Sequence, residues 1–125
     1  MIKGIGTDIV KIERIGAIIS RSGDRLAQRI LSKDEFKQYL ICGDRPSWLA
    51  KRFVAKEAAA KALGTGFRQG LRFEYLQITH DYLGKPAIEF LHDGSKLANE
   101  LGVTYTHLSL ADEKDFAVAF VVFEG

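Results

Sequence analysis

The stretch that decides the fold is WLAKRFVAKEAAAKALGTG, residues 48–66. It contains no proline, and its alanine, leucine and lysine residues are good helix formers. Gly64 and Gly66 follow the last apolar residue, and glycine tolerates the left-handed conformation in which many helices end. The sequence therefore predicts a long, mostly buried helix over about residues 48–63, with Ser47 capping its first turn.

The charged residues of this helix fall into two stripes. At about 100° per residue, Phe53, Glu57 and Lys61 share one stripe, and Arg52 and Lys56 form a basic stripe beside it. A glutamate four residues before a lysine is the favoured helical ion pair, contributing about 0.2–0.5 kcal/mol, and spacing alone favours this structural interpretation. The functional alternative makes Glu57 a Mg²⁺ ligand and Lys61 a contact to phosphate.

A second carboxylate is available for the same ion. Mg²⁺ takes hard oxygen ligands and is typically held by one or two carboxylates together with substrate phosphates. Asp8 lies at the end of the first predicted strand and could join Glu57. The glycines before Asp8 lack the third glycine of a dinucleotide fingerprint, and Gly64-Thr65-Gly66 lacks the Gly-Lys-Ser/Thr ending of a P-loop. The sequence therefore does not favour nucleoside-triphosphatase chemistry.

The rest of the chain predicts one α+β domain over residues 1–125. A turn at Gly4-Ile5-Gly6 is expected in the first strand, and Ser32 and Glu35 have the pattern of a capping box. The predicted strands cover about residues 1–10, 75–79, 87–91, 107–111 and 116–123. Helices first and strands mostly later are typical of an α+β fold, here a mainly antiparallel sheet packed against the long central helix. The last strand is apolar on both faces, which indicates a central or interface strand.

Composition and charge exclude several classes of protein. The single cysteine, Cys42, allows no internal disulfide, so nothing requires an oxidising compartment. No apolar stretch reaches the length of a membrane span, and residues 1–14 show no signal-peptide hydrophobic region. A net charge of +2 is too small to argue for nucleic acid or membrane. We expect a cytoplasmic protein that binds neither.

Basic residues concentrate near the N-terminus. Between residues 11 and 29 the chain has five basic side chains against only Glu13 and Asp24. The basic residues are Lys11, Arg14, Arg21, Arg25 and Arg29. Charge alone favours a solvated helix face, and the alternative is a docking surface for an acidic partner. A nucleic-acid-binding module is disfavoured because aromatic residues are not interleaved with these arginines.

Three motifs resemble those of the holo-[acyl-carrier-protein] synthase group of phosphopantetheinyl transferases, the small trimeric bacterial type. They are GIGTDIV at residues 4–10, with Arg14 following; RFVAKEAAAKALGTG at residues 52–66; and HLSLAD at residues 107–112. The turn LGKP at residues 83–86 also fits. The resemblance covers essentially the whole chain, in the same order. Many relatives have a further histidine where this chain has Asp112, so no role is assigned to Asp112.

The resemblance implies an activity and a site. It implies transfer of 4′-phosphopantetheine from coenzyme A to a serine of acyl carrier protein, for fatty acid biosynthesis, and a homotrimer with active sites between subunits. Asp8 and Glu57 would be the Mg²⁺ ligands, and Glu57 and Lys61 the catalytic residues. The coenzyme would contact Arg52, Lys56, Lys61, Gly64 and His107. The carrier protein would dock on Arg14, Arg21 and Arg25.

Two questions stay open at the level of sequence. The base that takes the serine proton is either Glu57 or a metal-bound water. A different Mg²⁺-dependent enzyme acting on another diphosphate compound would share Asp8, Glu57 and Lys61 and differ only in its acceptor.

Overall fold

The computed structural model describes residues 1–125 and contains helices and strands in the order that the sequence predicts. The N-terminal half holds one strand and four helices: β1 (Ile2–Lys11), α1 (Ile12–Ser22), α2 (Arg25–Ile30), α3 (Lys33–Ile41) and α4 (Arg45–Leu63). The C-terminal half holds η1, a 3₁₀ turn (Phe73–Tyr75), β2 (Leu76–His80), β3 (Pro86–Phe90), α5 (Asp93–Glu100), β4 (Tyr105–Asp112) and β5 (Phe116–Glu124).

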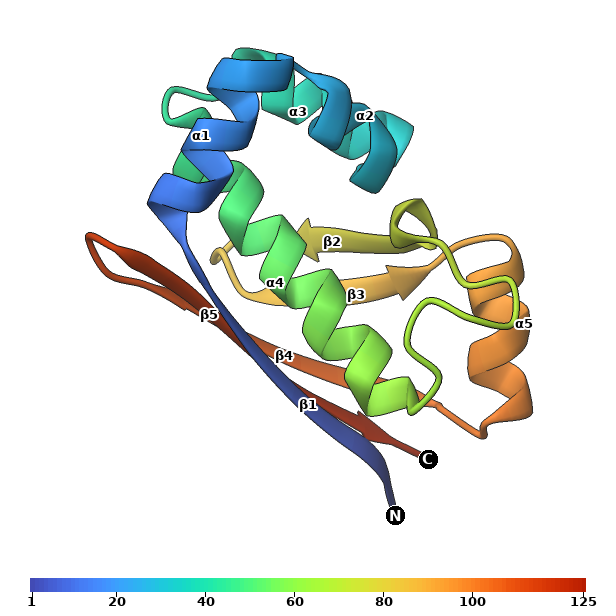
Figure 1. Cartoon of the computed structure of the whole chain (residues 1–125). Helices are drawn as coiled ribbons and strands as arrows, with labels where there is room; N and C mark the ends of the chain where they lie inside the picture. Colours follow the sequence, from blue (N-terminus) through green and yellow to red (C-terminus); the bar gives the residue numbers. More distant parts are fainter.

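One face of a three-stranded sheet is covered by α4 (Figure 1). The strand order is β1-β5-β4, and β2 and β3 form a separate hairpin. Every strand pairing is antiparallel, so the predicted α+β class with a mainly antiparallel sheet is confirmed. Strand β5 is central, as its two apolar faces indicated. Helices α1, α2 and α3 gather at one end of α4, whereas α5 packs against β3 and η1.

The two glycines of β1 allow α4 to approach the sheet very closely. A Cβ atom on Gly4 would lie 1.8 Å from the carbonyl oxygen of Ala62, and one on Gly6 would lie 2.0 Å from that of Ala58. The predicted turn at these glycines is wrong, because β1 is one strand from Ile2 to Lys11, with only a shift in its register against β5 between Ile2 and Gly4. The glycines and the alanines of α4 instead form a close strand–helix contact.

Helix α4 ends where the sequence predicts but begins earlier than predicted. Gly64 adopts a left-handed conformation with φ 79°, as predicted for a helix stop. The first turn begins earlier than expected, because the cap is Asp44, whose side chain accepts a hydrogen bond from the Ser47 amide. Pro46 fits this first turn, where no backbone donor is needed.

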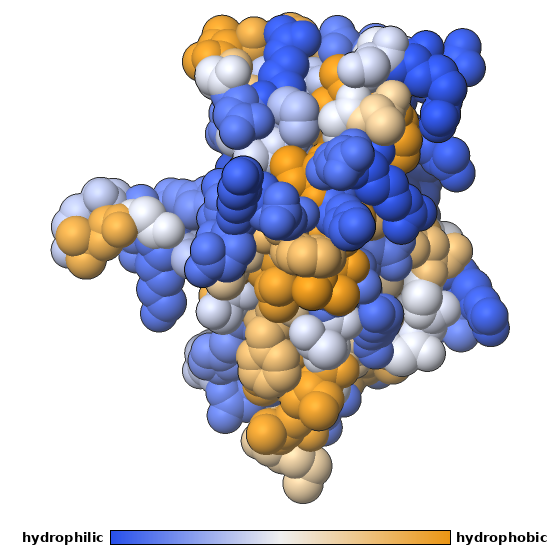
Figure 2. Space-filling view, turned by 60° about the vertical axis from the view of Figure 1, so that its left-hand side comes forward, coloured by the Kyte–Doolittle hydropathy of each residue, from blue (hydrophilic) through white to orange (hydrophobic).

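The opposite face of the sheet is uncovered and apolar. The outward side chains include Ile5 and Ile9 of β1 and Phe116 and Phe120 of β5, all exposed. Apolar side chains form a band over the lower part of the molecule in Figure 2, on the side of β1. A monomer rarely leaves such a continuous apolar surface in water. None of the helices is both long and apolar enough to cross a membrane.

Candidate active site

The predicted carboxylate on β1 lies beside the exposed end of α4. Strand alternation turns Asp8 toward the helix, as its partner Ala119 in β5 is fully buried on that side. The Nζ atom of Lys61 lies 3.2 Å from Oδ1 of Asp8 and donates to the carbonyl oxygen of Thr7 at 3.0 Å. Two residues 53 positions apart in the chain therefore meet.

Glu57 belongs to the same cluster. Burial raises the pKa of the Glu57 carboxyl, the nearby charge of Asp8 raises it further, and Lys61 and Arg14 oppose these effects. The i,i+4 ion pair between Glu57 and Lys61 is absent, since Lys61 pairs with Asp8 instead. Phe53, Glu57 and Lys61 share one stripe, as the helical spacing predicted, and it is the least buried stripe of the second half of α4.

The donor set fits Mg²⁺. Two carboxylates close enough to raise the pKa of one of them repel each other, and a divalent cation would relieve that repulsion. No group of three or more histidine, cysteine or acidic side chains gathers anywhere in the chain. One or two carboxylates are what Mg²⁺ usually takes from a protein, because waters and phosphates complete its shell. Asp8 and Glu57 would hold such an ion.

Lys56 does not lie where a phosphate could reach it. Its side chain has no exposed surface, and its ammonium donates to Glu35 and to the carbonyl oxygens of Ile30 and Phe73. The prediction that Lys56 contacts coenzyme phosphates is therefore wrong. The physical reason is that its position on α4 faces the core.

Arg52 is also nearly buried. Its guanidinium lies 4.0 Å from the centre of the Trp48 ring, and its Nε has no hydrogen-bond partner. Burial lowers its pKa, with the charge of Glu35 acting in the opposite direction. The structure does not bring Arg52 to Asp8 and Glu57, and a coenzyme contact there stays a prediction.

His107 lies on the other side of the sheet. In β4 the neighbouring Leu108 is buried under the helices, whereas His107 is exposed and its Nε2 is 2.9 Å from Oε1 of Glu124. Asp8 faces α4, so these two predicted site residues lie on opposite faces within one chain. Gly64, by contrast, is exposed at the end of α4, three residues after Lys61.

The predicted docking arginines form an exposed row at the α1–α2 end of the molecule. Arg14, Arg21 and Arg25 are all exposed, and none takes part in an ion pair. Arg14 is also close enough to lower the pKa of Glu57. The basic row therefore begins next to the carboxylate cluster.

Sequence reasoning missed an aromatic wall beside Glu57. The ring of Phe73, in η1, stacks on Phe53 of α4 with centroids 6.0 Å apart and on Phe67 at 3.7 Å. Phe53 precedes Glu57 by one helical turn. The only signal in the sequence was the position of Phe53 on the stripe of Glu57 and Lys61.

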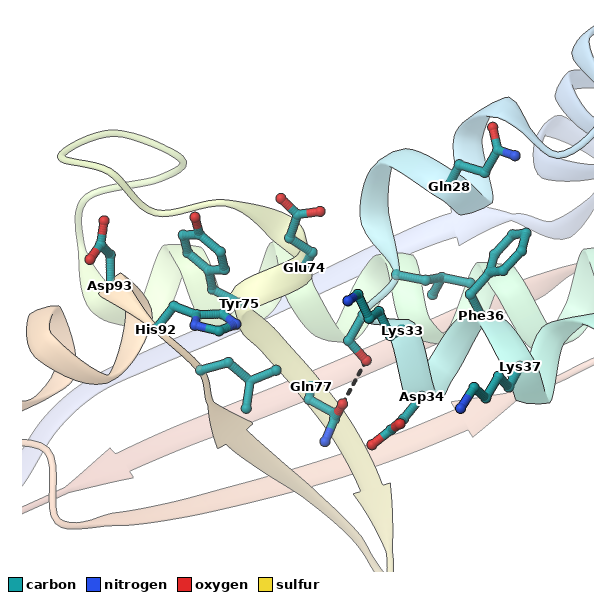
Figure 3. Close-up of a pocket in the computed structure, with 13 residues that line it drawn as sticks. Gln28, Lys33, Asp34, Phe36, Lys37, Glu74, Tyr75, Gln77, His92 and Asp93 are labelled. Carbon is teal, nitrogen blue, oxygen red and sulfur yellow. Dashed lines mark hydrogen bonds between the residues drawn. The ribbon is translucent and has the colours of Figure 1, made fainter.

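The structure also has a groove away from the cluster of Asp8, Glu57 and Lys61. It has a volume of about 980 Å³ and runs between the start of α3 and the segment from η1 to the start of α5 (Figure 3). Its lining mixes acidic, basic, amide and aromatic side chains, and none of the predicted site residues is among them. Its volume alone does not make it the site of chemistry.

Comparison with known proteins assigns the family. The model of the 4′-phosphopantetheinyl transferase superfamily matches residues 4–121. A holo-[acyl-carrier-protein] synthase of Sodalis glossinidius is 56% identical over 123 residues, which cover 98% of each chain. The chain therefore belongs to the 4′-phosphopantetheinyl transferase superfamily, as the motifs indicated.

Solved structures agree over the full length. A holo-[acyl-carrier-protein] synthase from Neisseria meningitidis is 45% identical, with a TM-score of 0.95 and complete coverage of both chains. A Helicobacter pylori synthase in complex with coenzyme A is 30% identical, with a TM-score of 0.83, covering 96% of this chain and 99% of the other. These similarities extend over all the elements that form the cluster of Asp8, Glu57 and Lys61.

Proposed function

We propose that this chain transfers the 4′-phosphopantetheine group of coenzyme A to a serine of acyl carrier protein, in a Mg²⁺-dependent reaction that releases adenosine 3′,5′-bisphosphate. The observation that carries the proposal is the cluster of Asp8, Glu57 and Lys61 between β1 and α4 in a member of this family. Similarity to holo-[acyl-carrier-protein] synthases, one with coenzyme A bound, supports the choice of substrates. The holo carrier would serve fatty acid biosynthesis in the cytoplasm.

The residues of the cluster divide the chemistry between them. The serine oxygen forms a bond to phosphorus while the bond to the bisphosphate breaks, so a proton leaves the serine and charge moves to the leaving phosphate. The proton acceptor would be Glu57 or a water bound to the ion. Lys61 would hold the charge on the leaving phosphate. Mg²⁺ held by Asp8 and Glu57 would supply neutralisation of the diphosphate.

The carrier protein would dock on the row of Arg14, Arg21 and Arg25. Acyl carrier proteins are acidic, and an exposed row of unpaired arginines complements such a surface. The row begins beside Glu57, so a carrier bound there would present its serine to the cluster. Charges at the rim of an interface mainly set the rate of encounter and its salt dependence.

A homotrimer would complete the site. The uncovered apolar face of the sheet is a surface of the kind that oligomers bury. His107 lies on that face, and in one chain it faces away from Asp8. It could reach coenzyme bound at the cluster only from a neighbouring copy.

Subunit mixing tests this arrangement. Glu57→Gln and His107→Ala chains, each impaired alone, are mixed after reversible dissociation. If each site takes Glu57 from one copy and His107 from the next, about one quarter of the sites in an equal mixture regain both residues. No recovery in a mixture shown to exchange subunits would place His107 outside the site.

The transfer assay tests the function itself. The protein is incubated with coenzyme A, Mg²⁺ and apo acyl carrier protein, and the carrier is weighed by mass spectrometry. A gain of one phosphopantetheine unit is expected, together with release of adenosine 3′,5′-bisphosphate. No gain at saturating substrates would favour the rival, a Mg²⁺-dependent enzyme acting on another diphosphate.

A further inference from the structure

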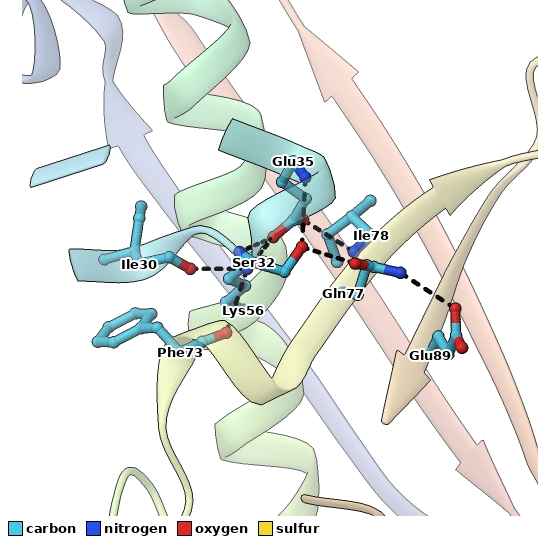
Figure 4. Close-up of polar contacts among 8 residues, drawn as sticks. All are labelled: Ile30, Ser32, Glu35, Lys56, Phe73, Gln77, Ile78 and Glu89. Carbon is cyan, nitrogen blue, oxygen red and sulfur yellow. Dashed lines mark hydrogen bonds and ion pairs between the residues drawn. The ribbon is translucent and has the colours of Figure 1, made fainter. Parts of the chain in front are cut away.

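A buried ion pair lies directly behind the candidate site. Nζ of Lys56 is 2.6 Å from Oε1 of Glu35, and the two side chains are 0% and 1% exposed. The ammonium also donates to the carbonyl oxygens of Ile30 at 2.7 Å and Phe73 at 3.1 Å. All three of its donors are therefore used (Figure 4).

The carboxylate of Glu35 is equally satisfied. Its Oε1 accepts from the Ser32 amide at 2.9 Å, which completes the predicted capping box of α3. Its Oε2 accepts from the Ile78 amide at 2.9 Å. The Ser32 hydroxyl donates in turn to Oε1 of Gln77 at 2.6 Å. The pair thus joins the end of α2 and the start of α3 to α4, η1 and β2.

Stability alone does not account for such a pair. Removing two charges from water costs free energy, and well-packed apolar residues often replace a buried ion pair without loss of stability. A fully satisfied polar network instead fixes one arrangement of the elements that it joins. The position of η1 is the relevant one here, because η1 meets α4 through the bond from Lys56 to the Phe73 carbonyl and through the stacking of Phe73 on Phe53.

The network leads to the site through Phe73. Its carbonyl oxygen accepts from Lys56, and its ring stacks on Phe53 and Phe67. Phe53 lies one turn before Glu57 on the open stripe of α4. Lys56 therefore sets the place of the aromatic wall that borders the carboxylate cluster, while its own charge never reaches the surface.

We propose that Lys56 and Glu35 are positioning residues, which hold η1 and its aromatic wall in the place where coenzyme A binds next to Glu57. The proposal rests on the proposed function for the identity of the ligand. A loosened wall would weaken binding of the coenzyme more than it slows the chemical step, because Asp8, Glu57 and Lys61 stay in place.

The test compares a charge-free network with a matched core defect. In Glu35→Gln/Lys56→Met the carboxamide oxygen can still accept from the backbone amide of Ser32 or of Ile78, and no charge is left buried, so folding is expected. Leu108→Ala, in β4, creates a cavity in the core away from the network. Melting temperature, kcat and the KM for coenzyme A are measured for both, and calorimetry gives the Kd of adenosine 3′,5′-bisphosphate, which does not depend on turnover.

Positioning predicts a split between the two variants. The double variant should raise the KM for coenzyme A and the Kd of the bisphosphate at least tenfold, with kcat within about threefold of the parent. Leu108→Ala should lower the melting temperature and leave both constants unchanged. Constants within twofold of the parent in the folded double variant would overturn the proposal.

Two further outcomes are also decisive. If the double variant does not fold, Glu35→Gln alone is judged by the same criterion, and failure of both to fold would mean a purely structural role. If the parent protein binds the bisphosphate but shows no carrier transfer, the proposed function fails while the positioning role is still decided by the Kd.

Discussion

Two lysines on α4, five residues apart, lie in opposite environments. Lys56 is fully buried and bonded to Glu35, whereas the side chain of Lys61 is 55% exposed and reaches Asp8. Both belong to the motif through which the chain resembles its family. The difference teaches that a shared motif contains residues of two kinds: those on the buried face hold neighbouring elements together, and those on the open face are available to substrate.

The largest expected effect is a difference in stability between variants of the two lysines, Lys56 and Lys61. Lys56→Met leaves the Glu35 carboxylate buried and unpaired, so the free energy of unfolding should fall by about 3–5 kcal/mol. Lys61→Met removes an exposed pair and should change it by less than about 1 kcal/mol. Urea denaturation at one fixed protein concentration measures both. Equal losses would end the distinction between the two faces.

Activity should show the reverse order. Glu57→Gln removes a metal ligand and a candidate base, so kcat should fall by about 10²–10³-fold, the usual cost of one positioned catalytic group. Glu100→Gln, at an exposed position on α5, is the control and should leave kcat unchanged. Single-turnover transfer to apo carrier protein is the measurement. A Glu57→Gln enzyme within threefold of the parent would contradict the assignment.

A substitution in β1 can disrupt the close contact between β1 and α4. In Gly6→Ala the new methyl group would meet the carbonyl oxygen of Ala58, so β1 must move away from α4. We expect a loss of about 1–3 kcal/mol in unfolding free energy, and weaker metal binding because Asp8 moves with the strand. Gly43→Ala, with open space around its Cβ position, is the matched control. Metal affinity retained in Gly6→Ala would show that the close approach is not what places Asp8.

A smaller effect is expected in the titration of Glu57, which lies on the open face of α4. In the metal-free protein, burial and then Asp8 raise the pKa of Glu57 above its unfolded value. The folded state therefore binds the extra proton between these two values, so this contribution stabilises the fold at low pH and is lost as pH rises through the raised pKa. Carbon-13 NMR of the Glu57 carboxyl should show the raised midpoint. Asp8→Asn should lower that midpoint but not to the ordinary value, because burial remains. An unchanged midpoint would show that the charge of Asp8 does not act on Glu57.

The smallest effect is expected at the docking row. Arg14→Glu should raise the KM for carrier protein several-fold at low salt, and the difference should shrink as salt screens the charges. The KM for coenzyme A should change less than the KM for carrier protein, although Arg14 lies near Glu57. A KM for carrier protein that equals the parent value at low salt would remove Arg14 from the docking surface.

The sequence predicts the parts of this molecule that local rules govern. Helical spacing places Phe53, Glu57 and Lys61 on one stripe of α4, Gly64 predicts the end of that helix, and Ser32 with Glu35 predicts the cap of α3. The family resemblance implied that Lys61 lies close to Asp8 and Glu57, and in the structure Lys61 contacts Asp8. Their roles in metal and phosphate binding stay predictions.

Long-range packing explains what the sequence did not reveal. Helical spacing separates the stripe of Lys56 from that of Lys61 but does not say which stripe meets the core, because its partner Glu35 lies 21 residues away. The alanines around Lys56 were a signal that this part of α4 is buried. A charged side chain in such a place needs a partner. Gly4 and Gly6 were expected to form a turn. Their close contact with α4 was missed, because that helix lies far along the chain.

The central claim is that Asp8 and Glu57 share one divalent ion beside Lys61. A crystal structure of the protein with coenzyme A and Mn²⁺, read from the anomalous signal of the metal, tests it most directly. We predict a single strong peak coordinated by one carboxylate oxygen of each residue. A peak bound by other residues, or carboxylates of Asp8 and Glu57 that point to separate places, would contradict the account.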